Sequence, residues 1–137
     1  MTPVETVENL IKLGTIISDA VQKKGGSKVD WQAFLASPEF KGIEGTVTNL
    51  VGSLKKSDVG DTIKALDDKQ KALLGGKSLA DLPTDKLLQY ADLGNVKVVL
   101  AAEQVSAAMN ANFGSWLVND ALPVLVKAAP MVLPLLV

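Results

Sequence analysis

Three groups of residues in this sequence have side-chain types and spacings that could bind a ligand or a metal ion. The first group resembles a phosphate-binding loop. Gly75-Gly76-Lys77-Ser78 ends as such loops do, with glycines and a lysine that would hold a phosphate. The full pattern also requires a glycine five positions before Gly76, but that position is Lys71, and no strand is expected ahead of it. We therefore interpret these residues as the end of one helix followed by the start of the next.

The second group consists of the aspartates Asp58, Asp61, Asp67 and Asp68, whose carboxylates are ligands of the kind that Mg²⁺ prefers. Asp58 and Asp61 belong to the start of a predicted helix, where acids complement the helix dipole. Asp67 and Asp68 lie opposite the apolar stripe of that helix and beside lysines, as on a solvated face. We therefore predict no metal site and no cofactor.

The third group is aromatic and could line a ligand pocket. Aromatic side chains at helical spacings belong more often to a core, and we expect that role for most of Trp31, Phe34, Phe40, Phe113 and Trp116. Trp116 stands ahead of an apolar C-terminal segment. It is therefore also placed to anchor a contact with another subunit or to lie at a bilayer surface.

The chain contains no histidine and no cysteine. This excludes the commonest general base, Ser-His and Cys-His arrangements, disulfides and zinc sites built on sulfur. The remaining carboxylates, lysines, hydroxyls and single tyrosine form no recognisable arrangement. We expect a protein that is not an enzyme, with no small-molecule substrate evident.

The charges also argue against nucleic acid as a partner. Fifteen acids against fourteen bases leave a formal net charge of −1, so no long-range field would attract a polyanion. Every base is lysine, whereas arginine supplies the planar fork that reads phosphates and base edges. Direct readout of nucleic acid is not expected.

The elements that position these residues are expected to be helices. Apolar residues recur at spacings of three and four along most of the chain, and no segment alternates with period two for long enough to form a strand. Caps, glycines and prolines divide this pattern into helices at about 3–24, 31–35, 38–54, 58–74, 84–93 and from 95 onward. The 137 residues predict an all-α fold, a single compact domain of five to seven short-to-medium helices with residues 1–120 as the helical domain.

The alanine-rich stretch that begins at Asn95 is predicted to form a central helix. Small or short polar side chains recur there every four residues, which would let another helix approach closely. The candidates for this close helix packing are Ala102, Ser106, Asn110 and Gly114.

The segment 121–137 is apolar and interrupted by prolines. Pro123 fits the first turn of a helix capped by Asp120, whereas Pro130 and Pro134 are expected to end that helix. The terminus would then be an extended strap. A spanning helix needs about 20 apolar residues. Since the segment is shorter and contains a lysine, we expect no transmembrane helix.

An apolar segment of this kind is expected to be shielded from water. It could pack in a groove of its own domain, against a neighbouring subunit or against lipid. Few charges interrupt it, because residues 97–137 hold only four charged side chains. The candidate interface residues are Trp116, Leu117, Leu122, Pro123, Leu125, Met131, Leu133, Pro134, Leu135, Leu136 and Val137.

Two function classes follow from these observations. The first is a structural or assembly subunit of a virion, a filament or another multi-subunit complex, which contacts itself or a protein partner through the charge-poor C-terminal third. The alternative is a lipid-associated or membrane-surface protein whose apolar C-terminus contacts the lipid. No basic region followed by an apolar stretch is present at the N-terminus, so no signal peptide is expected, and no cellular location is indicated.

Overall fold

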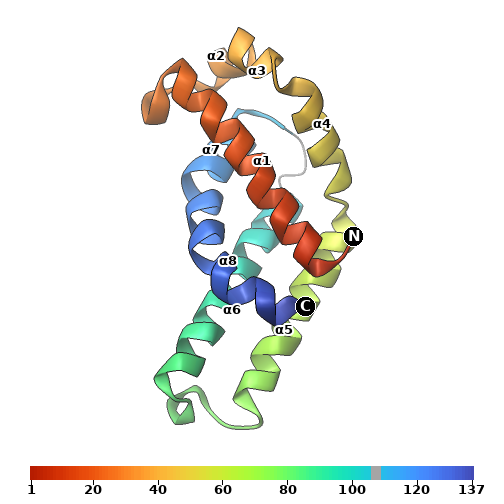
Figure 1. Cartoon of the computed structure of the whole chain (residues 1–137), viewed down its shortest axis with the longest axis vertical. Helices are drawn as coiled ribbons and strands as arrows, with labels where there is room; N and C mark the ends of the chain where they lie inside the picture. Colours follow the sequence, from red (N-terminus) through yellow and green to blue (C-terminus); the bar gives the residue numbers. More distant parts are fainter. Residues whose placement is uncertain (106–108) are drawn as a thin grey trace.

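The computed structural model describes residues 1–105 and 109–137, and the regular structure in these residues is helical (Figure 1). The helices are α1 (Pro3–Lys24), α2 (Trp31–Leu35), α3 (Pro38–Lys41), α4 (Glu44–Ser53), α5 (Lys56–Leu74), α6 (Thr84–Val105), α7 (Ala111–Trp116) and α8 (Leu122–Leu136). A π-helical turn, η3 (Leu117–Ala121), joins α7 to α8, so that Ala111–Leu136 is one continuous helix of 26 residues. With this helix counted once, the described residues form seven helices in one compact unit, which confirms the all-α prediction.

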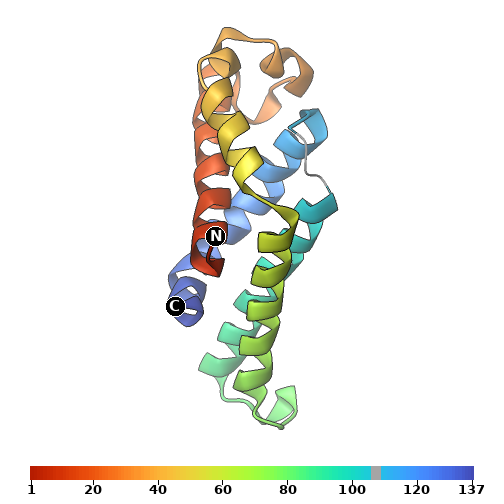
Figure 2. The same ribbon diagram turned by 90° about the vertical axis from the view of Figure 1, so that its right-hand side faces the viewer.

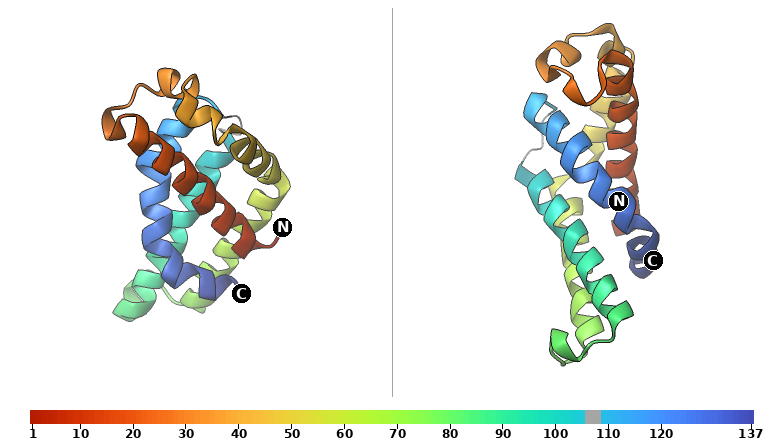
Figure 3. Two further views of the ribbon diagram at one scale, coloured as in Figure 1. Left: turned by 45° about the horizontal axis from the view of Figure 1, so that its top comes forward. Right: turned by 90° about the vertical axis from the view of Figure 1, so that its left-hand side faces the viewer.

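Helix α8 lies between α1 and α6 and contacts both of them. The short helices α2, α3 and α4 cover one end of the molecule, while α5 and α6 form a hairpin that projects at the other end (Figures 1 and 2). The hairpin extends past the level of both chain termini, as the side views also show (Figure 3). Both termini lie near the middle of the molecule, where α1 and α8 meet α5.

Helix α1 is confirmed where its sequence signals place it. The backbone N–H of Glu5 donates to Thr2 Oγ1 at 3.2 Å, and the backbone N–H of Thr2 donates to Glu5 Oε1 at 3.3 Å, which closes a capping box. The helix ends at Gly25. Its apolar stripe is buried throughout and forms one wall of the core; its members include Val7, Leu10, Leu13, Ile17 and Val21.

Helix α6 contradicts the predicted boundary at Gly94, because the helix runs through that residue without interruption. A glycine inside a helix costs about 1 kcal/mol relative to alanine. The buried stripe of Leu93, Val96 and Leu100 continues across it, and this packing outweighs the local penalty. The absence of a side chain also has a use, since a Cβ at Gly94 would lie 3.0 Å from Gln70 Nε2 of α5.

The predicted segment 38–54 is divided in two, as α3 and α4 with a break at Gly42 and Ile43. The start of α5 is also earlier than predicted, since the helix begins at Lys56 with no side-chain cap from Ser57 or Asp58. These differences move helix ends by a few residues. They leave the order of the helices unchanged.

The extended strap at the C-terminus was a wrong prediction, because α8 continues through Pro130 and Pro134 to Leu136. Each proline removes one backbone donor from the helix. Both prolines lie on the exposed side of α8, where solvent can satisfy the freed carbonyls. On the opposite side Leu125 and Val132 are fully buried, and this packing holds the helix together across the prolines.

Asp120 is likewise not a helix cap. It lies inside the continuous helix, in η3, and Ala121, which precedes α8, makes no side-chain capping bond. The predicted boundary between residues 120 and 121 therefore falls within one helix. Residues on both sides of it, Ala121 and Leu125 as well as Leu117, belong to the same core as α1.

The four residues predicted to form a close-packing stripe do not lie on one helix. Ala102 belongs to α6, while Asn110 caps α7 by accepting a hydrogen bond from the backbone N–H of Phe113 at 2.9 Å. Ser106 lies outside the described residues. Close packing is found at Gly114, where a Cβ would lie 2.8 Å from Trp31 Cζ3. The closely packed element is therefore α2.

Candidate interaction surface

Asp67, one of the four aspartates considered as metal ligands, is paired with lysines within the fold. Asp67 accepts hydrogen bonds from Lys71 Nζ and Lys97 Nζ, each at 3.0 Å, and these bonds hold the pKa of the Asp67 carboxyl below its ordinary value. Among the described residues no group of three or more carboxylates lies close enough to hold a metal ion. Gly75 and Gly76 adopt φ values of 55° and 83° and end α5, so the loop-like motif is a helix terminus in the hairpin turn.

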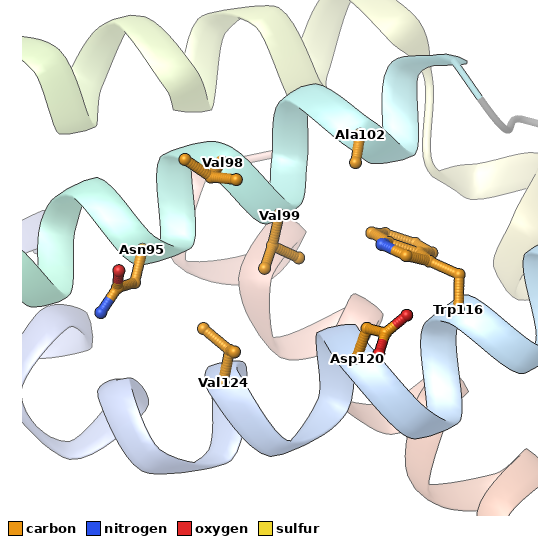
Figure 4. A pocket seen from close by; sticks show the side chains of 7 residues that line it. All are labelled: Asn95, Val98, Val99, Ala102, Trp116, Asp120 and Val124. Carbon is orange, nitrogen blue, oxygen red and sulfur yellow. The ribbon is translucent and has the colours of Figure 1, made fainter.

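A groove runs between α6 and the continuous α7–α8 helix, and it encloses about 250 Å³. The two helices are antiparallel here, with Asn95 across from Val124 and Ala102 across from Trp116 (Figure 4). Trp116, Asp120 and Val124 point toward α6 in this view. The walls are mainly apolar, and Asn95 and Asp120 are the polar side chains among the described residues that line it.

Helix α6 carries an apolar stripe on its outer side as well as on its buried side. The outer stripe recurs at alternating spacings of four and three, the repeat of a coiled-coil seam, through Leu87, Ala91, Gly94, Val98 and Ala101. Four of these residues are exposed, and Gly94 is half-buried beside Gln70 of α5. Val98 is 69% exposed, Leu88 beside the stripe is 56% exposed, and Leu87 is 38% exposed. Helix α6 packs against α5 and α8, and Leu87, Leu88 and Val98 remain exposed on the side that neither helix covers.

The outer side of the α7–α8 helix continues this surface across the groove. We name the combined surface the α6–α8 face; it consists of Leu87, Leu88, Ala91, Asn95, Val98, Ala102, Trp116, Asp120, Pro123, Val124 and Lys127. Among these residues only Asp120 and Lys127 are charged, and both are exposed. The face is therefore apolar along α6, with one acid and one base along α8.

The candidate interface residues predicted from the sequence divide into three groups. Leu117 and Leu125 are fully buried in the core of their own chain, so they are not available to another molecule. Trp116, Leu122, Met131, Leu133, Leu135 and Leu136 are half-buried. Pro123, Pro134 and Val137 are exposed.

The sequence reasoning missed the contribution of α6. Leu87, Leu88 and Val98 are exposed large apolar side chains, but they precede the C-terminal residues that were predicted to form the interface. The heptad spacing from Leu87 to Ala101 was the available signal. It was hidden because the helix was expected to end at Gly94.

A second apolar groove of about 450 Å³ lies between α1 and the other side of α8. No charged residue lines it among those described, and Val126, with 54% of its surface exposed, stands at its edge. The complete lining is Ile11, Val126, Ala129, Pro130, Leu133 and Pro134.

A third hollow, of about 390 Å³, lies between α1 and α3 and is more polar than the other two. Asp19, Lys23 and Glu39 contribute to its lining. A hydrogen bond from the Glu39 backbone, helped by one from Ser37, holds the pKa of the Glu39 carboxyl below its ordinary value. Because this hollow carries both acidic and basic side chains, its charge does not favour one class of ligand, and we do not assign it as a binding site.

Glu103 is the one glutamate of the described core, with 4% of its surface exposed. Burial raises the pKa of its carboxyl, and no hydrogen bond or ion pair from a described residue offsets that effect. Its position near the C-terminal end of α6 is also unfavourable for a negative charge. Glu103 does not line the groove beside it, so we assign it to stability and not to a binding site.

One helix in the described part of the chain, Ala111–Leu136, is long and apolar enough to cross a membrane, with a mean hydropathy of 1.4 in its most apolar window. Length and composition are the whole basis of that statement. The length argument made for residues 121–137 does not apply to this longer helix, because the ten residues 111–120 precede that segment in the same helix. In the structure 28% of that window is buried, and the buried residues form a stripe that faces α1 and α6.

Comparison of the chain with protein-family models, with curated proteins and with solved structures finds no match in any of the three.

Proposed function

We propose that the protein is a non-enzymatic structural subunit that assembles with further copies of itself through the α6–α8 face. The observation that carries the proposal is the exposed apolar stripe of α6, with Val98 69% exposed and Leu88 56% exposed. Contiguous apolar surfaces of this kind mark interaction sites on soluble proteins. Virions, filaments and other multi-subunit complexes are the assemblies that such subunits build.

Two physical arguments support a protein partner for this face. Burying a large apolar side chain is worth about 1.5 to 3 kcal/mol, and a symmetric contact buries each side chain of the face twice. Helices α5 and α1 also pack against the inner sides of α6 and α8, whereas the exposed apolar stripe of α6 has no described helix packed upon it. A second α6–α8 face would cover that stripe.

The test compares two exposed valines on different surfaces. Val98→Glu places a charge at the centre of the α6–α8 face, whereas Val126→Glu places the same charge at the edge of the groove between α1 and α8. Light scattering and sedimentation equilibrium without detergent, at about 1 to 100 µM, measure the mass of each protein. We expect a discrete oligomer for the unmodified chain and Val126→Glu, and a monomer for Val98→Glu. An unmodified chain that remains a monomer throughout this range would contradict the proposal.

A lipid surface is the second candidate partner, favoured by the 26-residue apolar helix and by the charge-free groove beside it. Binding would place the groove between α1 and α8 against the acyl chains. Flotation with uncharged phosphatidylcholine vesicles tests this, and Val126→Glu is then the variant expected to lose binding while Val98→Glu retains it. The two valines therefore separate the two candidate functions.

A further inference from the structure

Two opposite charges stand alone on the α6–α8 face. Asp120 and Lys127 are both exposed, and neither forms a hydrogen bond or ion pair with another described residue. Asp120, in the π-helical turn η3, lines the groove with Val124, and Lys127 lies one turn of α8 beyond Val124, so the two charges are about two turns, or roughly 10 Å, apart along one continuous helix. The midpoint between them lies beside Val124, which is across the groove from Asn95 (Figure 4).

This symmetric placement has a consequence for a two-fold contact. A two-fold axis that crosses both helices at the level of Val124 and Asn95 lays each helix antiparallel on its own copy. The same rotation brings Asp120 opposite Lys127 of the partner subunit, and Lys127 opposite Asp120 of the partner subunit. One axis therefore satisfies both isolated charges.

We propose that a second copy of this chain docks on the α6–α8 face in this antiparallel arrangement, with two ion pairs between Asp120 and the partner's Lys127. The inference rests on the proposed function, and it specifies the partner and the geometry of the contact. A two-fold axis parallel to the helices would instead lay α8 on the partner's α6. Asp120 would then meet the apolar stripe near Val98, with no cation to receive it.

The side chains of α6 support the same axis independently. Rotation about a point between Gly94 and Asn95 places Val98 opposite the partner's Ala91. It also places Leu87 opposite the partner's Ala102 and Leu88 opposite the partner's Ala101. Each large apolar side chain of the stripe thus meets a small one, the condition for two helices to interdigitate.

Asn95 lies next to this axis and meets the partner's Asn95. A polar residue at one position of an apolar seam fixes register and orientation, because a shifted alignment would bury its amide without a partner. Helix α6 therefore contributes the apolar contact and its register, while α8 contributes the charge pairing.

Charge reversal tests the geometry. In Asp120→Lys a lysine faces a lysine at each pairing point, and in Lys127→Asp an aspartate faces an aspartate. The repulsion is expected to raise the dimer Kd of each variant on the order of tenfold. An equimolar mixture of the two variants restores opposite charges at both points, and so does the double variant. Both are expected to return to within about threefold of the unmodified Kd.

Asp68→Lys is the matched control, since it reverses an exposed charge on α5 away from the face and changes the net charge equally. Its Kd is expected to equal that of the unmodified chain. Circular dichroism melting of each variant establishes that the monomer fold is intact, as expected for substitutions of exposed side chains.

The outcomes separate this inference from the proposed function. Weakening by each single reversal, with recovery in the mixture and in the double variant, supports the antiparallel contact. An oligomer whose Kd is insensitive to these reversals overturns this geometry and leaves self-assembly standing. An unmodified chain that is monomeric overturns both.

Discussion

The region where α1 crosses α8 and the projecting end of the α5–α6 hairpin are held together in different ways. At the crossing, Leu10, Leu13 and Ile17 of α1 have no exposed surface. In the hairpin, no residue from 71 to 92 is fully buried, although leucines are frequent there. A high leucine content alone therefore does not produce a buried core. Two helices alone leave their apolar sides exposed, whereas three or more can enclose them.

The hairpin is joined instead by polar contacts at its base. The buried Gln70 side chain donates from Nε2 to the Tyr90 carbonyl at 3.0 Å, and its Oε1 accepts from Lys97 Nζ at 2.8 Å. Lys97 also binds Asp67. We name this group the hairpin latch; its members are Asp67, Gln70, Tyr90 and Lys97. Its hydrogen bonds fix the orientation and register of α5 relative to α6, in a region where few apolar side chains are buried.

The largest expected effect is a contrast between two leucine truncations. Leu10→Ala removes a fully buried side chain and is expected to cost about 2 to 5 kcal/mol of unfolding free energy. Leu79→Ala, in the hairpin turn with 45% exposure, is expected to change it by less than about 0.5 kcal/mol. Urea denaturation followed by circular dichroism measures both. Equal losses would show that the projecting end is part of the same core.

The next contrast concerns two helical glycines. Gly114→Ala places a Cβ 2.8 Å from the Trp31 ring and is expected to destabilise the chain by about 1 to 3 kcal/mol through overpacking. Gly52→Ala in α4 meets nothing within 4 Å and is expected to stabilise it by about 0.4 to 1 kcal/mol. Thermal melting gives the signs of both changes. A neutral Gly114→Ala would mean that α2 is not tightly seated on α7.

The hairpin latch predicts a local effect. Gln70→Ala removes two hydrogen bonds of a buried side chain, for an expected loss of about 1 to 2 kcal/mol. Hydrogen exchange should accelerate in residues 71–92 while the amides of α1 keep their protection. Lys71→Ala removes only an exposed ion pair to Asp67 and serves as the control, with no change expected. Acceleration spread evenly over α1 and the hairpin would contradict a local latch.

The smallest expected effect depends on pH and concerns Glu103 of α6. Because burial raises the pKa of this carboxyl above its ordinary 4.5, the protonated form is favoured in the folded chain. Its stabilising contribution is complete below pH 4.5 and is lost as pH rises through the raised pKa. Glu103→Gln is expected to be more stable than the unmodified chain at neutral pH, by about 1 kcal/mol, and the difference should shrink on acidification. Parallel denaturation curves at several pH values measure this. A difference in stability between the two proteins that increased toward low pH would contradict a raised pKa of Glu103.

Local signals in the sequence were sufficient for much of the fold. Thr2 and Pro3 marked the start of α1, Asp30 and Ser37 capped α2 and α3, and Gly75 ended α5. Each is an interaction within a few residues, so a sequence window contains all of it. The fold class followed from these signals and from the helical spacing of the apolar residues.

The candidate site was predicted less completely. The C-terminal segment was correctly singled out as apolar, but Leu117 and Leu125 proved to be buried, and Leu87, Leu88 and Val98 were not foreseen. Periodicity identifies an apolar stripe but does not state which neighbour covers it. That depends on how α1, α6 and α8 are arranged around one another.

By itself, the sequence determined that this chain is helical, that it lacks histidine and cysteine chemistry, and that its C-terminal third is poor in charge. Composition and spacing are properties of the chain alone, and they need no neighbour to be read. Only the tertiary structure decided that α6 passes through Gly94, that α8 passes through Pro130 and Pro134, and that the α6–α8 face is exposed. In the first two cases long-range burial competes with a local penalty of a few kcal/mol or less, and the burial is larger. The exposure of the face depends on which sides of α6 and α8 the other helices cover.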